Sequence, residues 1–219
     1  MPSLPLFPLG TVLTPGEKLP LRIFEPRYVT MLRDLLARRK AGEEDLFGVV
    51  AIRQGHEVGV GNVMALHEIG CAARLDQVSD AGHQSFAVMA SGVRRFRLES
   101  VERDGRTPYS TGFVTWLNDH VRDPELVAHI ATRLASAIQV YRDQVGMSHV
   151  ELPTDPTPLS YEAARHVMLD VGDRQRLLSA RDVDSRLLLA LRLARRETTL
   201  VRELAAMPGA YSLPSPSPH

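Results

Sequence analysis

Residues 19–28, LPLRIFEPRY, change from a strand pattern to a helix pattern, and this constrains the fold more than any other stretch. Pro20 has no backbone N–H to donate and holds Leu19 in an extended conformation. The leucine and isoleucine that follow favour a half-buried strand. Glu25-Pro26 then favours a helix start, because proline suits the first helical position and a carboxylate suits a helix N-terminus. The chain is therefore expected to mix strands and helices.

Short apolar segments divided by turn residues fill the first half of the chain. Prolines interrupt the first of them, residues 4–9, so we expect this strand at a sheet edge or beside an opening, where a missing hydrogen-bond donor is tolerated. Residues 95–99 alternate in polarity, which predicts a strand with one solvent-exposed face. Ser91-Gly92 is expected to form a turn before it. The expected elements are a helix over about 25–39, strands over 46–52, 69–78, 86–90, 95–99 and 109–117, a loop near 55–62 and a turn at Asp104-Gly105.

Helical periodicity replaces this pattern from about Asn118 onward. The predicted helices are 124–145 capped by Asp123, 161–171 capped by Thr157 or Ser160, a short helix from Gly172-Asp173 through Ala180, and a final long helix capped by Asp182. The predicted inward faces hold Leu126, Ile130, Leu134, Ala137 and Tyr141 in the first helix and Leu187, Leu191, Ala194, Val201 and Leu204 in the last. These patterns divide the chain into a β-rich part, 1–118, a helical part, 119–209, and a proline- and serine-rich tail, 210–219, that is expected to be mobile.

The composition limits the classes of partner and compartment. The chain has 26 Lys and Arg against 26 Asp and Glu, and this zero net charge argues against nucleic acid or an anionic membrane as the main partner. A single cysteine, Cys71, excludes an internal disulfide and a cysteine metal cluster. No apolar run approaches the roughly 20 residues that span a bilayer, and no secretory signal is evident, so a cytoplasmic protein is expected.

Sequence motifs for catalysis are weak or missing. Gly59-Val60-Gly61 lacks the third glycine of a dinucleotide site, and no Gly-Lys-Ser or Gly-Lys-Thr is present for a nucleotide phosphate. His67, Glu68 and Cys71 would point to different faces of a strand, so a metal site there is disfavoured and Cys71 is expected to be a small buried residue. No Gly-x-Ser-x-Gly elbow accompanies any serine. We therefore assign no catalytic, metal-binding or cofactor-binding residue, and we expect no cofactor.

Several segments together resemble one known family. They are residues 4–10, LPLFPLG; 19–28, LPLRIFEPRY; 47–50, FGVV; 67–73, HEIGCAA; 92–98, GVRRFRL; and, in the helical half, 173–178, DRQRLL. In this order they resemble the Lon N-terminal domain family, the substrate-binding region of the ATP-dependent protease Lon, which also occurs as a stand-alone bacterial protein. The resemblance implies a twisted β pseudo-barrel with one inserted helix, followed by an α-helical bundle. Full Lon proteases carry an ATPase and a Ser–Lys peptidase after this region, and this sequence shows neither a Walker motif nor a convincing Ser–Lys dyad.

The resemblance implies a non-catalytic module that binds exposed apolar or unfolded polypeptide segments. Such a module would act in protein quality control and deliver clients to a protease or chaperone. Binding would use an apolar patch, supplemented by strand addition at a free sheet edge such as residues 4–9. The candidate binding residues are Phe24, Arg27, Tyr28 and Trp116. Phe24 and Tyr28 also fit core positions, and Arg27 also fits an ion pair with Glu25.

Two other hypotheses stay open. The chain could be a hydrolase with an unrecognised histidine-centred site, which a histidine of perturbed pKa beside a serine or carboxylate would favour. It could also be a structural or regulatory protein that oligomerises through its helical half. An uncovered apolar face on the last helix would favour that hypothesis.

Overall fold

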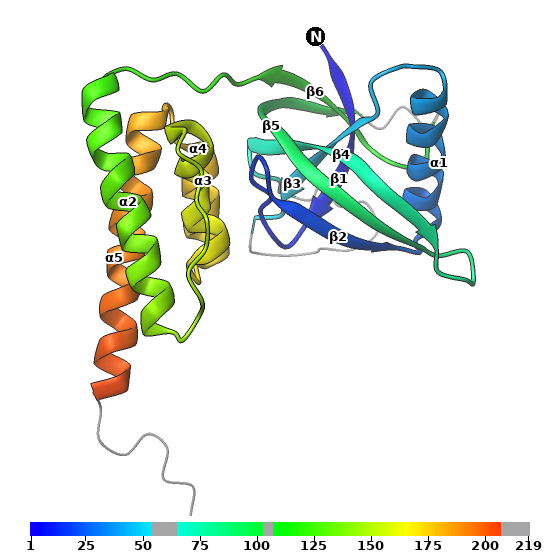
Figure 1. Ribbon diagram of the computed structural model, residues 1–219. Coiled ribbons are helices and arrows are strands. Elements are labelled where there is room, and N and C mark those ends of the chain that lie inside the picture. The colour runs from blue at the N-terminus through cyan, green and yellow to red at the C-terminus, as the bar shows by residue number, and fades with distance from the viewer. Residues whose placement is uncertain (54–64, 103–106, 207–219) are drawn as a thin grey trace, which may run out of the picture.

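The computed structural model describes residues 1–53, 65–102 and 107–206, which form a β-rich half and a helical half packed side by side (Figure 1). The first half contains β1 (Ser3–Leu9), β2 (Lys18–Ile23), α1 (Pro26–Lys40), β3 (Leu46–Ala51), β4 (Ile69–Asp80), β5 (Phe86–Glu102) and β6 (Thr111–Trp116). The second contains α2 (Pro124–Gln144), α3 (Pro156–His166), α4 (Val171–Ser179) and α5 (Val183–Ala206). This arrangement confirms the predicted α+β class and its order. The predicted loop near 55–62 with Gly59-Val60-Gly61, the turn at Asp104-Gly105 and the tail 210–219 lie wholly or largely outside the described residues.

Five of the described strands close into a ring. β1 pairs in parallel with β3, and the ring continues through antiparallel pairs β3–β4, β4–β5, β5–β6 and β6–β1. β2 pairs with β5 alone among the described strands, so the free edge belongs to β2. The prediction that β1 lies at an edge is wrong. Its prolines are tolerated because each neighbour uses only part of the strand: β6 pairs with residues 3–5 and β3 with residues 6–9.

β5 is one continuous strand, so the predicted turn at Ser91-Gly92 is also wrong. The register shifts there, because Ala73 faces Gly92 while Ala72 faces Arg94, which leaves one extra residue in β5 and bends the strand. The Gly92 N–H donates to Glu17 O at 2.9 Å, and its carbonyl accepts from Gly16 N at 2.8 Å. A Cβ at Gly92 would overlap the Thr14 carbonyl oxygen. The glycine therefore permits close approach of the β1–β2 loop.

Helix α1 covers one side of the barrel with the face that its periodicity predicts. Tyr28, Met31, Leu32 and Leu35 are buried against strand residues such as Phe7. A smaller cluster fills the other side of the sheet around a fully buried Phe96. Cys71 is buried in the larger cluster, as expected for a structural cysteine, and burial raises the pKa of its thiol.

Each helix of the second half begins at an aspartate whose carboxylate accepts a backbone N–H. Asp123 and Asp182 were predicted as caps, and they accept from Leu126 N at 3.0 Å and Ser185 N at 2.9 Å. The other two caps were placed wrongly. Helix α3 begins five residues earlier than predicted, after Asp155, and α4 begins after Asp170. An aspartate directly before Pro156 combines cap and first-position proline, which outweighs the hydroxyl caps considered for α3.

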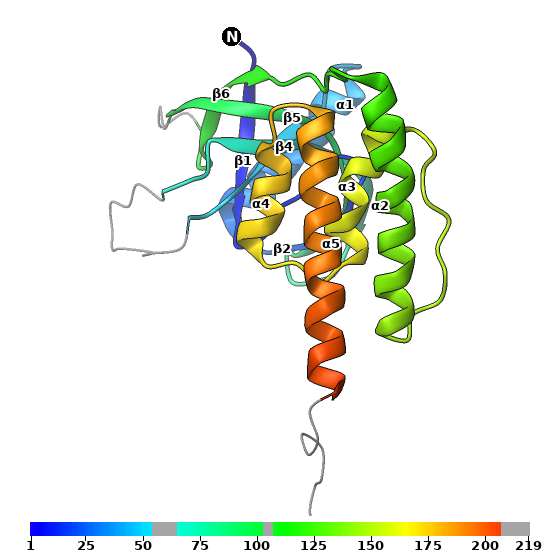
Figure 2. The ribbon, with the colours of Figure 1, turned by 90° about the vertical axis from the view of Figure 1, so that its left-hand side faces the viewer.

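Helices α2 and α5 lie side by side and run in the same direction (Figures 1 and 2). The Val183 N–H donates to His120 O near one end, and Arg202 bonds Gln144 at the other. The predicted inward residues Ile130, Leu134, Tyr141, Leu187, Leu191 and Ala194 are buried, and Ala137 and Val201 are half-buried. Leu126 and Leu204 were predicted wrongly and are 42% and 64% exposed. Leu204 is exposed because the last turns of α5 extend past the neighbouring helices (Figure 2).

Candidate functional site

An exposed corner forms where β2 runs into α1. Leu19, Leu21 and Ile23 point toward the core, so the alternation of the strand sends Pro20, Arg22 and Phe24 outward. Phe24 is 66% exposed and therefore does not belong to the core. We call Pro20, Arg22, Phe24 and Arg27 the β2–α1 corner; Arg27 Nη2 lies 2.7 Å from Glu25 Oε2 in an exposed ion pair.

Tyr28 supports this corner from inside. Its ring is 8% exposed and stacks on Phe7 with centroids 4.3 Å apart. The guanidinium of Arg27 lies 4.7 Å from the Tyr28 centroid, which positions the arginine on the outer surface. Tyr28 therefore holds Arg27 in place while its own ring stays in the core.

Trp116 lies far from this corner. It faces Phe96 on β5, whereas Ile23, which precedes Phe24, faces Phe86. Ten residues of strand separate these two positions, a distance of about 30 Å at the usual rise of about 3.3 Å per residue. The guanidinium of Arg94 stacks 3.5 Å above the half-buried Trp116 ring. The four candidate residues thus do not form one surface.

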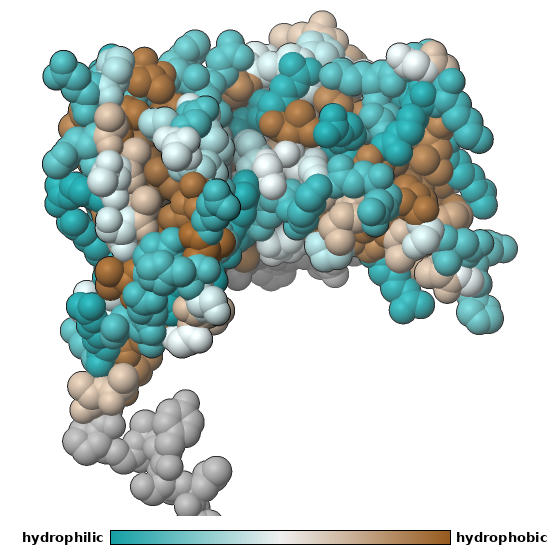
Figure 3. Space-filling view, viewed as in Figure 1, coloured by the Kyte–Doolittle hydropathy of each residue, from teal (hydrophilic) through white to brown (hydrophobic). Residues whose placement is uncertain are grey.

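Hydrophobic residues on the face drawn in Figure 3 gather in separate small patches over the two halves. Among the described residues, and apart from Met1 and the last turns of α5, the large apolar side chains with the greatest exposure are Met168 at 80% and Phe24 at 66%. Phe24 alone among the candidates combines exposure with a position next to the free strand edge. Among the four candidate residues, those of the β2–α1 corner are therefore the ones open to solvent beside a free strand edge.

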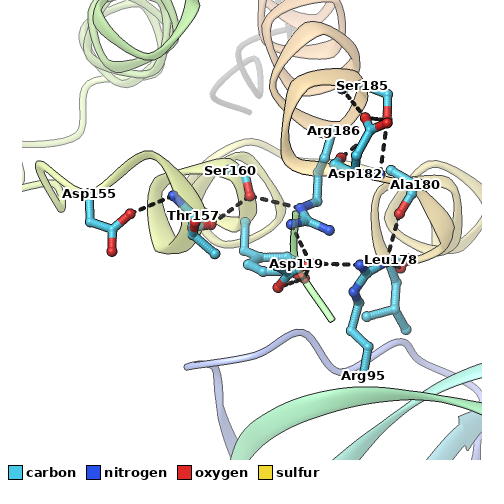
Figure 4. A network of polar contacts seen from close by, with 11 residues as sticks. Arg95, Asp119, Asp155, Thr157, Ser160, Leu178, Ala180, Asp182, Ser185 and Arg186 are labelled. Atoms are coloured by element: carbon cyan, nitrogen blue, oxygen red, sulfur yellow. Dashed lines mark hydrogen bonds and ion pairs between the residues drawn. The ribbon is translucent and has the colours of Figure 1, made fainter. Parts of the chain in front are cut away.

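A buried polar network joins the two halves (Figure 4). Arg95 Nη2 of β5 and Arg186 Nη2 of α5 both donate to Asp119 Oδ1, at 2.6 and 2.7 Å. The Tyr161 hydroxyl donates to the other oxygen of Asp119 at 3.0 Å, and Arg186 Nε donates to Ser160 Oγ at 2.7 Å. Burial opposes ionisation of Asp119, but Arg186 and Arg95 outweigh it, so the pKa of this carboxyl lies below its usual value.

Arg95 also closes the end of α4. Its Nη1 donates to the carbonyls of Leu178 and Ala180 at 2.8 and 2.7 Å. The side chain is 2% exposed, which corrects the prediction that this strand position belongs to a solvated face. Sequence reasoning missed Asp119 and Arg186 because nothing local marks them: one follows a strand and the other lies on an amphipathic helix. The network fastens the halves together.

The hydroxyl and thiol groups in the core and in the buried network bond to carbonyls, carboxylates or a guanidinium: Cys71 contacts Ala72 O, Ser160 contacts Thr157 O and Arg186 Nε, and Ser185 contacts Asp182 Oδ1. His166 Nε2 lies 3.1 Å from Glu162 Oε2, and the other ring nitrogen contacts Arg142. Within the described ranges no three His, Cys, Asp or Glu side chains are grouped to hold a metal. The described helices also include none that is long and apolar enough to cross a membrane.

Comparison with known proteins assigns the fold to a class. A family model described as "ATP-dependent protease La (LON) substrate-binding domain" matches residues 3–196. The match to the crystal structure of a Lon N-terminal domain protein from Xanthomonas campestris covers 95% of this chain and 100% of the Xanthomonas chain, with 27% identity and a TM-score of 0.61. The match to the N-terminal domain of Mycobacterium avium complex Lon protease covers 89% of this chain and 98% of the Mycobacterium chain, with 18% identity and a TM-score of 0.64. At this identity the match supports the fold alone.

The fold and the family match define a substrate-binding domain of the Lon type. The chain belongs to the Lon substrate-binding domain family. Lon protease 2 of Sorangium cellulosum is 30% identical over an alignment of 210 residues, which covers 91% of this chain and 25% of that protein. Lon protease 2 of Myxococcus xanthus is 24% identical over an alignment of 207 residues, which covers 91% of this chain and 24% of that protein. The chain thus spans about a quarter of the length of these relatives.

Proposed function

We propose that this protein binds exposed apolar or unfolded segments of other polypeptides, without cleaving them, and presents them to a Lon-type protease. Membership of the Lon substrate-binding domain family supports the binding role. The β2–α1 corner supports an apolar contact, because Phe24 is a large side chain left 66% exposed by the alternation of β2. This exposure is the observation that carries the proposal.

Strand addition is the second part of the contact. β2 has an unpaired edge among the described strands, and an extended client segment could pair with it. Lys18, Pro20 and Arg22 occupy the outward positions of β2, and such residues limit uncontrolled edge pairing. Side-chain contact with Phe24 therefore supplies most of the binding, and strand pairing extends it.

Retention of reduced, unfolded casein on the immobilised protein, without ATP, tests the proposal. Wild-type protein should retain casein intact, and Phe24→Ser should weaken retention at least fivefold. Leu204→Ser is the matched control, because Leu204 is 64% exposed but lies on the last turns of α5. Equal loss in both variants, or no retention by the wild type, would contradict the proposal.

The same experiment separates the two rival functions. A hydrolase would convert casein to fragments, visible by gel electrophoresis, and changing one serine or histidine would stop it. A purely oligomerising protein would leave casein unbound and would change its own size with concentration in light scattering. Intact, retained casein supports the binding module over both rivals.

A further inference from the structure

A polar pocket of about 480 Å³ lies at the junction of the two halves. It is lined by Arg53 after β3, His67 and Glu68 before β4, Arg97 of β5, and Gln175 and Ser179 of α4. Three of these residues, His67, Glu68 and Arg97, belong to the segments HEIGCAA and GVRRFRL. Their side chains take no part in the strand pairing of the barrel or in the buried polar network. The pocket therefore needs its own explanation.

One set of pocket groups is cationic and lacks a carboxylate partner. Arg97 follows Arg94 and Arg95 on β5, and those two pair with Glu44 and Asp119. The guanidinium of Arg97 is exposed and makes no ion pair within the described ranges, and the same holds for Arg53. Two unpaired guanidiniums in one pocket favour a carboxylate or phosphate, which arginine binds with paired hydrogen bonds.

The other set of pocket groups accepts hydrogen bonds. Gln175 is 6% exposed, and its Nε2 donates to Ile69 O at 3.0 Å and contacts Ser179 Oγ at 3.1 Å. Because a carbonyl can only accept, Nε2 must face Ile69, and this leaves Gln175 Oε1 buried without a donor. Glu68 is exposed and makes no ion pair with a described residue. Burial and the charge of Arg53 lower the pKa of His67, so its ring is neutral near pH 7 and can accept.

We propose that this pocket binds the C-terminal end of a polypeptide, with its carboxylate on Arg97 and Arg53 and its last backbone N–H groups toward Glu68, His67 and Gln175. A polypeptide end carries an anion and amide donors next to each other, which matches both sets of pocket groups. Inorganic phosphate supplies the charge without the amide donors that Glu68, His67 and Gln175 would accept from. The inference rests on the proposed function, since it names which part of a client this second contact recognises.

Paired peptides test the pocket directly on the full chain. The probes are an N-acetylated pentapeptide of alanine and leucine with a free C-terminal carboxylate, and the same peptide with a C-terminal amide. Titration into ¹⁵N-labelled protein should shift the Gln175 side-chain amide signals, and the acid should bind roughly tenfold more tightly than the amide, as expected for a charge-assisted pair. Arg97→Gln and Arg53→Gln should each bring the affinity for the acid down to that for the amide. Arg192→Gln, at an exposed position on α5, should change neither affinity.

Further probes decide the source of the carboxylate. N-acetyl-leucine should bind more weakly than the acid pentapeptide; equal affinity would assign the pocket to small carboxylic acids and overturn the proposal. Tighter binding of inorganic phosphate would overturn it as well. Equal affinity for acid and amide, with casein still retained through Phe24, would reject the pocket alone. Acid-dependent peptide binding without casein retention would reject the proposed function and leave the pocket standing.

Discussion

Asp119 Oδ1 lies 2.7 Å from Nη2 of Arg186, whose side chain is fully buried. The same carboxylate oxygen accepts from Arg95 on the barrel, so one anion lies between two buried cations from different halves. The Tyr161 ring packs 4.1 Å from the Arg186 guanidinium, and its hydroxyl completes the site. The negative charge of Asp119 compensates only part of the positive charge of the two arginines. The junction of the two halves therefore depends on Asp119 remaining ionised.

Asp119→Asn should destabilise the whole chain. The amide can keep hydrogen bonds but leaves Arg95 and Arg186 buried without a counter-charge, which costs about 3 kcal/mol when a buried pair is broken. Urea unfolding monitored by circular dichroism at pH 7 measures the change. Asp143→Asn is the control, because Asp143 is exposed and pairs with the exposed His149. A loss below about 1 kcal/mol would contradict a central role for Asp119.

Acid should weaken the protein through carboxylates that the fold keeps ionised. The pKa of Asp76 is lowered by hydrogen bonds from Ser91 and Lys18, and the pKa of Asp182 by hydrogen bonds from Ser185. Asp119 behaves likewise. A folded-state pKa below the unfolded value of about 3.9 gives stability that is present above that value and is lost as the pH falls through the folded pKa. Unfolding free energy should fall most steeply below about pH 4, and less steeply there in Asp119→Asn.

Gly92→Ala should destabilise the barrel by about 2 kcal/mol, because a methyl group must displace the backbone of the β1–β2 loop. The added Cβ overlaps the Thr14 carbonyl oxygen, and backbone cannot swing aside as a side chain can. Gly10→Ala is the matched control, since nothing lies within 4 Å of its added Cβ. Thermal unfolding of both variants checks the prediction, and equal melting temperatures would refute it.

Trp116 is the only tryptophan and reports on the surface away from the β2–α1 corner. Casein binding at Phe24 should leave its fluorescence emission unchanged, because the two positions are separated by about 30 Å of strand. Arg94→Ala should move the emission to longer wavelength, since the guanidinium that covers the ring is removed. Arg97→Gln should not, because Arg97 does not stack on Trp116. A client-induced emission shift would place Trp116 in the binding surface.

Local signals were sufficient to predict the elements that depend on local chemistry. Asp123 and Asp182 were identified as caps, and the periodicity of residues 28–35 predicted the buried face of α1. The transition from β2 to α1 at Glu25-Pro26 was also predicted correctly, with α1 beginning at Pro26. These features depend on neighbours within a few residues, so the sequence alone contains the necessary information.

Features that depend on distant partners were not predictable. The prolines of residues 4–9 predicted an edge position for β1. Its actual position depends on β3 and β6, each of which pairs with a different part of the strand. Ser91-Gly92 has turn chemistry, and only the approach of the β1–β2 loop makes it a bulge inside β5. Phe24 could have been core or surface, and the register of β2 on β5 decides it. For the same reason the sequence alone does not reveal the burial of Arg186, which depends on Asp119 from another segment.

Arg95 supplies two hydrogen bonds that the last turn of α4 would otherwise lack, so a residue of the barrel completes a helix of the neighbouring half. A chimaera that grafts the helical half of a relative onto this barrel must therefore preserve the side chain at position 95 together with the carbonyl geometry it serves. Transplanted without that match, the graft would leave helix carbonyls and a buried cation unsatisfied at the seam. The border between the two halves is thus a poor place to cut, although the polypeptide crosses it as a single extended strand of backbone.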